Sequence, residues 1–231
     1  SFTTSGSGAG SRRGSKKRGM SEPGVAGLNW DHEDALRRMG FRRIAGLDEV
    51  GRGSLAGPVV AAAVILDRSS RLPGVRDSKL LSEARRSEQF GEIALSATAY
   101  GFGVVEAETV DRINVLEATR EAMMAAVAAL PEPPDALLID ALALPGLDLP
   151  QRSLIHGDRL CLSIAAASVL AKVFRDEMMR DFDTFFPAYR FRSNKGYGTR
   201  EHRRALSLHG PTPLHRRTFG GVRPLLFREE S

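Results

Sequence analysis

The sequence predicts an α/β fold, in which strands and helices pack in layers around one core. The apolar run 58–66 (PVVAAAVIL) is typical of a buried strand, and helical and strand patterns alternate after it. The chain has 231 residues, of which 42% are hydrophobic, so it is long enough to build one good core. No apolar run approaches the length of a membrane span, and we expect no contact with a membrane.

Four elements are predicted in the first part of the chain. A short helix is expected over 31–40, because a glycine ends the pattern there. The segments 42–50 and 58–66 indicate two strands joined across a glycine-rich turn. Residues 82–98 indicate a helix that begins at a serine, a residue type favoured at helix N-termini.

The middle of the chain indicates one long helix among short strands. A strand over 100–107 precedes the longest helical pattern, 108–130, which a proline-rich segment stops. Two short strands are then expected over 135–140 and 152–158, and each ends in an acidic residue. We see no internal repeat.

Two further helices are predicted toward the C-terminus. Residues 162–186 indicate a mostly buried helix, and residues 199–210 indicate a final helix that Gly210 and Pro211 end. The first 27 residues are rich in Ser, Gly and basic side chains and cannot bury enough surface to fold. We therefore expect a disordered basic tail over 1–27, a folded domain over 28–220 and a short tail over 221–231.

Charge is distributed unevenly along the chain. Residues 28–188 hold 18 basic and 24 acidic residues, a net charge of −6, whereas residues 189–223 hold nine basic residues and one acidic residue, a net charge of +8. An acidic body with a basic C-terminal block favours a polyanionic partner such as nucleic acid, although a basic solvated surface has the same composition. The single cysteine, Cys161, excludes an intramolecular disulfide, and we expect a cytoplasmic protein because no signal-peptide pattern is present.

Acidic residues end three of the predicted strands: Asp48 with Glu49, Asp140, and Asp158. Open α/β sheets bind their ligands beyond strand ends, so these carboxylates can meet there. A carboxylate cluster without His or Cys suits Mg²⁺ or Mn²⁺ and argues against zinc. Two such ions, about 3.5–4 Å apart, can activate a water and stabilise the leaving oxygen of a phosphodiester. Each acid alone is more simply an ordinary strand-end residue, but the three ends and the basic flank together favour a metal site.

One geometric difficulty concerns Asp48 and Glu49. Neighbouring residues on a regular strand point to opposite faces, so both can reach one site only if the strand ends or twists at Glu49. Gly51 and Gly53 would permit this, or Glu49 could contribute through its backbone. These glycines do not match a dinucleotide fingerprint, and no Gly-Lys-Ser/Thr loop follows them.

The motif DEVGRGSLAGPVVAAAVIL (48–66) resembles the signature of the bacterial ribonuclease HII family. Further matches follow in order, so that the resemblance covers about residues 41–220: DSKLLS (77–82), DRINVLEAT (111–119), LLIDA (137–141), IHGD (155–158), IAAASVLAKVFRD (164–176), NKGYGTREH (194–202) and GPTPLHRRTF (210–219). It implies a ribonuclease H-like fold, with a mixed central β-sheet flanked by helices and a small C-terminal helical part at about 187–220.

The resemblance also implies roles for individual residues. The active-site acids, which would bind two divalent cations, would be Asp48, Glu49, Asp140 and Asp158. The Gly-Arg-Gly element that contacts the ribonucleotide 2′-OH would be Gly51, Arg52 and Gly53. Tyr197 would pack on the deoxyribose just beyond the ribonucleotide. Lys79 and Lys195 would meet the substrate, although Lys79 could equally cap its own loop.

The family pattern implies an endoribonuclease that hydrolyses the RNA strand of RNA–DNA hybrids. It would also nick 5′ of ribonucleotides embedded in duplex DNA, by a two-metal-ion mechanism that gives 3′-OH and 5′-phosphate ends. We expect a monomer. The alternative is a non-catalytic nucleic-acid-binding protein on the same fold, which would require one of the acids to be missing.

Several residues depart from the family pattern or need separate interpretation. Ser54 replaces a proline or a small residue such as cysteine, and Ala141 replaces a common glycine. We expect Asp176 to form a structural ion pair on its buried helix. The histidines lack metal-ligand spacing, and surface or substrate-facing roles are expected for those in or near the basic regions: His156, His202, His209 and His215.

Overall fold

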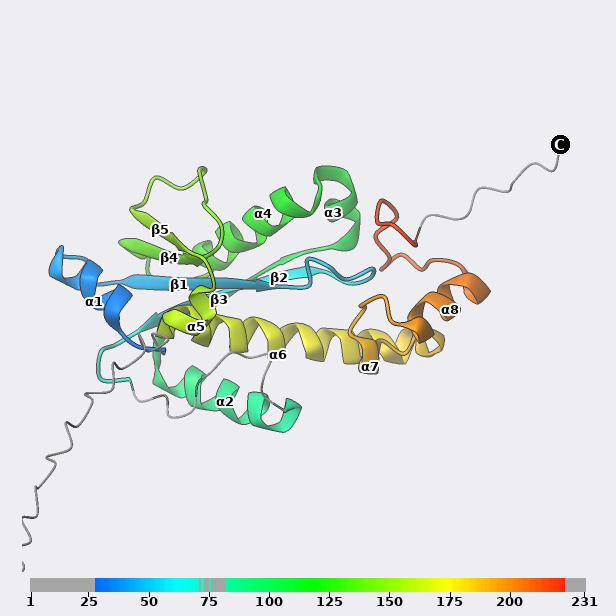
Figure 1. Ribbon diagram of the computed structural model, residues 1–231, viewed down its shortest axis with the longest axis horizontal. Coiled ribbons are helices and arrows are strands. Elements are labelled where there is room, and N and C mark those ends of the chain that lie inside the picture. The colour runs from blue at the N-terminus through cyan, green and yellow to red at the C-terminus, as the bar shows by residue number, and fades with distance from the viewer. Residues whose placement is uncertain (1–27, 71, 73–74, 76–81, 223–231) are drawn as a thin grey trace, which may run out of the picture.

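The computed structural model describes residues 28–70, 72, 75 and 82–222 (Figure 1). The predicted tail over 1–27, most of the predicted tail over 221–231, and Lys79 lie outside the described residues. No helix among the described residues is long and apolar enough to cross a membrane.

Five strands form one mixed sheet in the order β3-β2-β1-β4-β5. Their bounds are β1 Ile44–Val50, β2 Val59–Leu66, β3 Ala97–Val105, β4 Ala136–Asp140 and β5 Gln151–Leu154. The antiparallel pairs are β1–β2 and β2–β3, and the parallel pairs are β1–β4 and β4–β5. The predicted α/β class and the mixed sheet are therefore confirmed.

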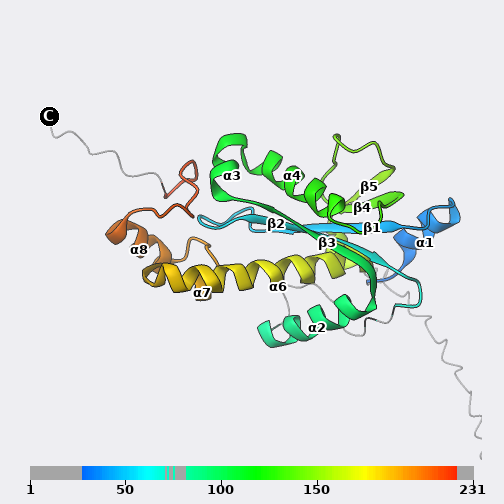
Figure 2. The same ribbon diagram turned by 180° about the vertical axis from the view of Figure 1, so that it is seen from behind.

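Helices cover both faces of this sheet (Figures 1 and 2). On one face lie α3 (Ala107–Ile113) and α4 (Val115–Ala128), and on the other lies the long helix α6 (Leu162–Phe185), with α2 (Glu83–Ser96) packed outside it. All eight residues of β2 are buried, because the strand has a helix on each side. This double burial explains why the run 58–66 has no polar alternation.

The predicted long helix over 108–130 is wrong, because the chain breaks at Asn114. Asn114 has a φ of 69° and separates α3 from α4. Its side chain accepts hydrogen bonds from the N–H groups of Leu116 (2.9 Å) and Glu117 (3.1 Å), so it caps α4. The apolar pattern continues across Asn114, so periodicity alone does not reveal that a new helix starts there.

The predicted strand over 152–158 is too long, because β5 ends at Leu154. His156 takes a left-handed conformation with a φ of 58°, and the short helix α5 (Gly157–Leu160) begins directly after it. Asp158 therefore lies in the first turn of α5, and the expectation of a strand end at Asp158 is wrong.

The remaining predicted helices are confirmed with small shifts in their bounds. Helix α1 covers Asp31–Arg38, and Ser82 caps α2 by accepting from the Arg85 N–H. The C-terminal part consists of η2 (Pro187–Tyr189), α7 (Phe191–Asn194) and α8 (Arg200–His209). After Gly210 the chain returns without a helix to the loop after β1, where the Gly57 N–H donates to Leu214 O at 2.8 Å.

Strand β1 and helix α6 approach each other most closely at Gly46. A Cβ atom on Gly46 would lie 2.3 Å from the Ser163 carbonyl carbon and 2.5 Å from the Ile164 nitrogen. Both obstacles are backbone atoms, which cannot turn aside as a side chain can. Glycine at this position therefore sets the distance between the sheet and α6.

We expect Gly46→Ala to destabilise the fold by about 1–3 kcal/mol or more, because α6 has to move away from β1. Gly91→Ala is the matched control: Gly91 lies inside α2 with open space around it, and alanine there should stabilise by about 0.5–1 kcal/mol. The free energy of unfolding in urea measures both changes. Equal stability of the two variants would show that the contact at Gly46 is not tight.

Candidate active site

Asp48 and Asp140 come from one end of the parallel strands β1 and β4, and Asp158 lies on α5, which follows β5. Leu47 of β1 pairs with Ile139 of β4, and continuing this register by one residue sets Asp48 beside Asp140. The N–H of Gly157, the residue before Asp158, donates to Asp140 Oδ1 at 2.7 Å. Asp48 and Asp158 are buried, with exposed fractions of 5% and 4%. The fold thus gathers carboxylates that lie far apart in the sequence.

Glu49 lies on a strand that stays regular, so the expectation that β1 ends or twists at Glu49 is wrong. Glu49 pairs with Ala61, and β1 continues to Val50. By strand alternation Glu49 shares a face with Leu47, which packs in the core on the α4 side, whereas Asp48 faces α6. Glu49 Oε1 instead accepts a hydrogen bond from Arg52 Nη1 at 3.2 Å.

The acids nevertheless act on one another electrostatically. Burial raises the pKa of Asp48 well above its ordinary value of 3.8, and the charges of Glu49 and Asp140 add to the rise, while a hydrogen bond from Ser168 opposes it. Burial also raises the pKa of Glu49; the Arg52 guanidinium lowers it and the Asp140 charge raises it. The charges of Asp48, Glu49 and Asp140 thus influence one another, although Asp48 and Glu49 approach from two faces of the sheet.

The donor set fits a hard divalent cation but is not closed around one. Among the described residues, no three His, Cys, Asp or Glu side chains are placed so that they could already hold a metal ion together. However, Glu49 Oε2 is buried and has no hydrogen-bond partner within the described part of the chain. All the available ligand atoms are carboxylate oxygens, which Mg²⁺ and Mn²⁺ prefer. A cation would satisfy the unpartnered oxygen and relieve the repulsion.

After β1 the chain enters the glycine-rich loop (residues 51–57), which is held by hydrogen bonds from Arg175. The Arg175 side chain, on α6, is fully buried and donates to Ser54 Oγ (2.8 Å), Ala56 O (3.1 Å) and Pro58 O (2.9 Å). Gly51 has a φ of 95°, and a Cβ atom there would lie 2.3 Å from Arg175 Nε. The departure at Ser54 is accommodated, since its hydroxyl also donates to Gly51 O at 2.8 Å.

The same guanidinium reaches the loop that carries Tyr197. Arg175 Nη1 donates to Lys195 O at 2.9 Å, and the guanidinium carbon lies 5.7 Å from the centre of the Tyr197 ring. Gly196 O accepts from the Leu55 N–H at 2.8 Å, which binds this Tyr197 loop (residues 195–198) to the glycine-rich loop. The Tyr197 side chain remains 38% exposed. The structure therefore brings together the two segments in which recognition residues were predicted.

A second buried arginine supports the glycine-rich loop from the C-terminal segment. Arg216 is fully buried and donates to Gly57 O from Nε (3.1 Å) and Nη2 (2.8 Å), and to Arg52 O from Nη1 (2.9 Å). Ser168, Arg175 and Arg216 were not predicted. Each lies in a segment that reads as core or as part of a basic run, so only the folded structure reveals its partners.

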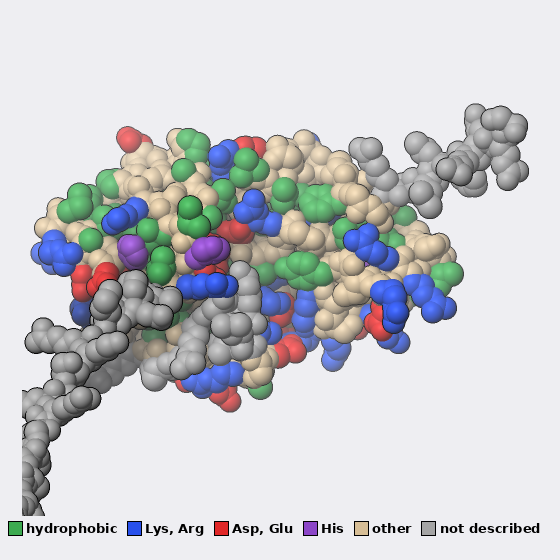
Figure 3. All heavy atoms as spheres, viewed as in Figure 1, with side chains coloured by type: hydrophobic (Ala, Val, Ile, Leu, Met, Phe, Trp, Pro, Cys, Tyr) green, Lys and Arg blue, Asp and Glu red, His purple; other side chains and the backbone are tan. Residues whose placement is uncertain are grey.

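The basic block is exposed for the most part. Basic side chains gather over α7 and α8 at the right of Figure 3, and the exposed ones include Arg192, Arg200 and Arg203. Lys195 differs, because its side chain is only 12% exposed and its Nζ lies 3.5 Å from Glu83 Oε1 on α2.

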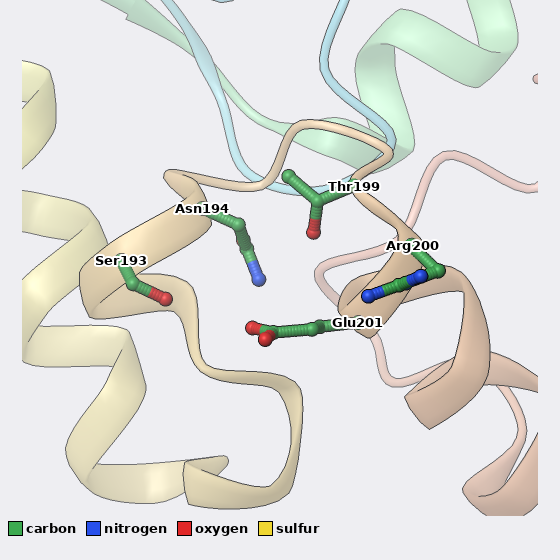
Figure 4. Close-up of a pocket in the computed structure, with 5 residues that line it drawn as sticks. All are labelled: Ser193, Asn194, Thr199, Arg200 and Glu201. Atoms are coloured by element: carbon green, nitrogen blue, oxygen red, sulfur yellow. The ribbon is translucent and has the colours of Figure 1, made fainter.

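A hollow of about 380 Å³ lies between α7 and the start of α8 (Figure 4). Its lining includes one cation and one anion, so it shows no preference for a charged ligand: Ser193, Asn194, Thr199, Arg200 and Glu201.

The other separately considered residues divide into two groups. Asp176 is buried and forms an ion pair with Lys172, one helical turn earlier. His156 and His209 are exposed, but His202 and His215 are fully buried, so the expectation of surface or substrate-facing roles is wrong for these two. Ala141 has a φ of 51°, a left-handed conformation in which the family's glycine would be less strained.

Residues 45–222 match the Ribonuclease HII family. Ribonuclease HII of Geobacter sulfurreducens is 50% identical over 194 residues, which are 84% of this chain and 89% of that protein. The structure of ribonuclease H2 from Pyrococcus horikoshii OT3 is similar, with a TM-score of 0.66 at 24% identity over 79% of this chain and 96% of that one. The structure of Bst-RNase HIII in complex with Mn²⁺ has a TM-score of 0.59 at 21% identity over 81% of this chain and 70% of that one.

We expect Asp140→Asn to stabilise the metal-free protein at neutral pH by about 1 kcal/mol, because it removes one charge from the repelling group. A raised native pKa means that the folded protein binds more protons than the unfolded chain, so Asp48 weakens stability progressively as pH rises above 3.8. The variant should therefore show a shallower loss of stability from acidic to neutral pH. Added Mn²⁺ should stabilise the unsubstituted protein more than the variant.

Asp148→Asn, a charge change at an exposed residue of the loop between β4 and β5, is the control. The thermal stability of all three proteins is measured as a function of pH, first in a chelator and then in separate samples with Mn²⁺. Identical pH profiles for the unsubstituted protein and Asp140→Asn would remove Asp140 from the group.

Proposed function

Since this chain belongs to the ribonuclease HII family and so acts as an endonuclease on the RNA of RNA–DNA hybrids, we propose that it also nicks DNA duplexes 5′ of embedded ribonucleotides. The products would carry 3′-OH and 5′-phosphate ends. The substrates would be RNA–DNA hybrids and DNA duplexes that contain ribonucleotides. We assign the activity to one catalytic domain over residues 28–220.

The observation that carries this proposal is that one side chain holds both the glycine-rich loop and the Tyr197 loop. Arg175 holds the glycine-rich loop and the Tyr197 loop together with hydrogen bonds of 2.8–3.1 Å. A single ribonucleotide in DNA differs from its neighbours by one 2′-OH, and an enzyme that cuts there has to read that hydroxyl and the sugar that lacks one. Two recognition segments at fixed separation meet that requirement.

The acids would hold two divalent cations, Mg²⁺ or Mn²⁺. The proposed ligands are Asp48, Glu49, Asp140 and Asp158. Their all-oxygen chemistry and the unpartnered Glu49 Oε2 support this assignment, as does the Mn²⁺ complex of the similar Bst-RNase HIII. When bound, the two ions would activate the attacking water and stabilise the leaving 3′ oxygen.

The chain's own groups orient these carboxylates. Ser168 donates to Asp48, the Gly157 N–H holds Asp140, and Arg52 holds Glu49. Each of these partners leaves one or more carboxylate lone pairs for other ligands. The orientation of the acids is thus prepared before an ion or substrate arrives.

The Gly-Arg-Gly element would read the 2′-OH through its backbone. Gly51 O and Arg52 O already accept hydrogen bonds from Ser54 and Arg216, so we assign the contact to N–H groups of this loop. Gly53 has open space around its Cα, which allows a sugar to approach closely. The Arg52 side chain would serve Glu49 instead of the sugar.

Tyr197 would pack its half-exposed ring on the deoxyribose that follows the ribonucleotide. A second 2′-OH at that sugar would be crowded or would lose water without a hydrogen bond. Around this contact, exposed arginines of the basic block would bind phosphates, which positions a duplex without reading its sequence. Lys195 would join them if a phosphate displaces its long contact with Glu83, and Lys79 belongs to the same proposal.

We expect cleavage of a labelled duplex with one ribonucleotide in Mg²⁺ or Mn²⁺ and none in a chelator. Asp140→Asn should slow it by roughly a hundredfold or more, because even groups that merely orient a metal ligand are worth 10–100-fold. Binding to the duplex should survive this substitution. Tight binding by the unsubstituted protein without any cleavage would instead favour the alternative of a non-catalytic nucleic-acid-binding protein.

Tyr197→Ala should lower kcat/KM for the single-ribonucleotide duplex on the order of tenfold more than for a uniform hybrid, because the ring meets only a deoxyribose. Tyr100→Ala is a matched control, since the Tyr100 side chain is 37% exposed and lies on β3. Kinetics on both substrates decide the matter. Equal losses on the two substrates in Tyr197→Ala would make the ring general scaffolding.

A further inference from the structure

Two buried imidazoles lie behind the Tyr197 loop. His202 on α8 and His215 in the C-terminal segment are 0% and 2% exposed, and their Nε2 atoms lie 3.0 Å apart. The rings pack against Phe191, whose centre is 5.5 Å from His202 and 5.7 Å from His215. Neither histidine has a function in the chemistry described above.

The hydrogen-bond partners fix which nitrogens carry hydrogen. Tyr197 O can only accept, so His202 Nδ1, at 2.9 Å, is the donor, and Nε2 of the neutral ring is an acceptor. The Thr212 N–H donates to His215 Nδ1 at 2.9 Å, so His215 carries its hydrogen on Nε2. His215 Nε2 therefore donates to His202 Nε2. All four ring nitrogens are used in one direction, from Thr212 through both rings to Tyr197 O.

This relay joins the backbones of both recognition segments. At one end it holds the carbonyl of Tyr197 itself. At the other, the segment that carries His215 is bridged to Ala56 and accepts the Gly57 N–H through Leu214 O. The two rings thus form a further link between the Tyr197 loop and the glycine-rich loop, beside the direct Leu55–Gly196 hydrogen bond and Arg175.

We propose that His202 and His215 are positioning residues for ribonucleotide recognition, which hold Tyr197 in register with the glycine-rich loop only while both rings are neutral. This inference rests on the proposed role of Tyr197 at the junction. A further proton would place N–H against N–H at one link of the relay, either between the two Nε2 atoms or between His215 Nδ1 and the Thr212 N–H, and would break the connection between the Tyr197 loop and the C-terminal segment. The consequence is loss of junction selectivity before loss of cleavage.

The surroundings keep the rings neutral. Burial lowers the pKa of His202, and burial together with the neighbouring His202 lowers the pKa of His215 to about 4. The relay's contribution to stability is complete above the ordinary histidine pKa of 6.5 and is lost as pH falls from there toward about 4. Other titratable or charged groups near the pair come from four parts of the chain: Arg203 and His209 on α8, Tyr189 on η2, Glu108 and Asp111 on α3, and Arg216 and Arg217 in the C-terminal segment.

The kinetic test uses two substitutions of one histidine at neutral pH. His215→Phe keeps a ring but removes the relay, and should lose about tenfold in kcat/KM on the single-ribonucleotide duplex relative to a uniform hybrid. His215→Gln places an amide N–H near the position of Nε2 and should keep the ratio within about twofold of the unsubstituted protein. His209→Phe, at an exposed histidine of α8, should leave the ratio unchanged. If His215→Phe does not fold, His215→Asn, too short to reach His202, replaces it.

The outcomes separate this inference from the proposed function. If Tyr197→Ala alters junction selectivity but His215→Phe lowers both substrates equally, the positioning role is wrong and the role of Tyr197 stands. If Tyr197→Ala has no selective effect, the proposed junction reading fails instead. The relay itself is tested by imidazole ¹⁵N NMR, which should show hydrogen on His202 Nδ1 and on His215 Nε2 at neutral pH. The opposite tautomers, or a charged ring, would overturn it.

Discussion

The contact between β1 and α6 is the constraint on which the rest of the site depends. Gly46 lets the helix backbone lie against the strand, and the residues that follow on each element then meet in order. Ser168 reaches Asp48, and Arg175, seven residues later, reaches the two recognition loops. Seven residues of α-helix span about 10 Å. Helix α6 therefore sets a fixed spacing between the carboxylates and the groups proposed to read the sugar.

The polar groups beside this contact fall into two electrostatic classes. Asp48 and Asp158 are buried, the pKa values of Asp48 and Glu49 are raised, and one Glu49 oxygen has no partner among the described residues, a combination that suits the binding of cations. The guanidiniums of Arg175 and Arg216 are also buried, but backbone carbonyls and a hydroxyl receive them. Glu49 thus keeps an unpartnered oxygen where a metal would bind, whereas the two guanidiniums are satisfied by the protein itself. Because Arg175 holds both loops, the proposed recognition of the sugar would depend on this arginine as well as on the residues that contact the substrate.

Much of the fold could be predicted from periodicity, and the proximity of Asp48 and Asp140 from their strand-end positions. The unbroken apolar run of β2, the Ser82 cap and the terminator Gly210 each act locally, so the sequence alone indicates their structure. The break at Asn114 and the turn at His156 before Asp158 could not be predicted. A positive φ at a residue other than glycine depends on the capping hydrogen bonds and contacts that form in the folded structure. The structural roles of Arg175 and His202 could not be predicted for another reason. The hydrogen-bond partners of Arg175 lie 20 to 121 positions away, and His215, the partner of His202, lies 13 positions away. Their signal in the sequence is no stronger than that of a surface charge.

The central claim is that the buried acids form a divalent-cation site, and proton release on metal binding tests it most directly. Mn²⁺ binding can be followed by titration calorimetry in buffers of different ionisation enthalpy, at mildly acidic and at alkaline pH. Because the pKa values of Asp48 and Glu49 are raised, we expect Mn²⁺ to expel protons at the acidic pH and none at the alkaline pH, and Asp48→Asn to reduce the release. Mn²⁺ binding without proton release at either pH, or a release that is unchanged in Asp48→Asn, would contradict the account.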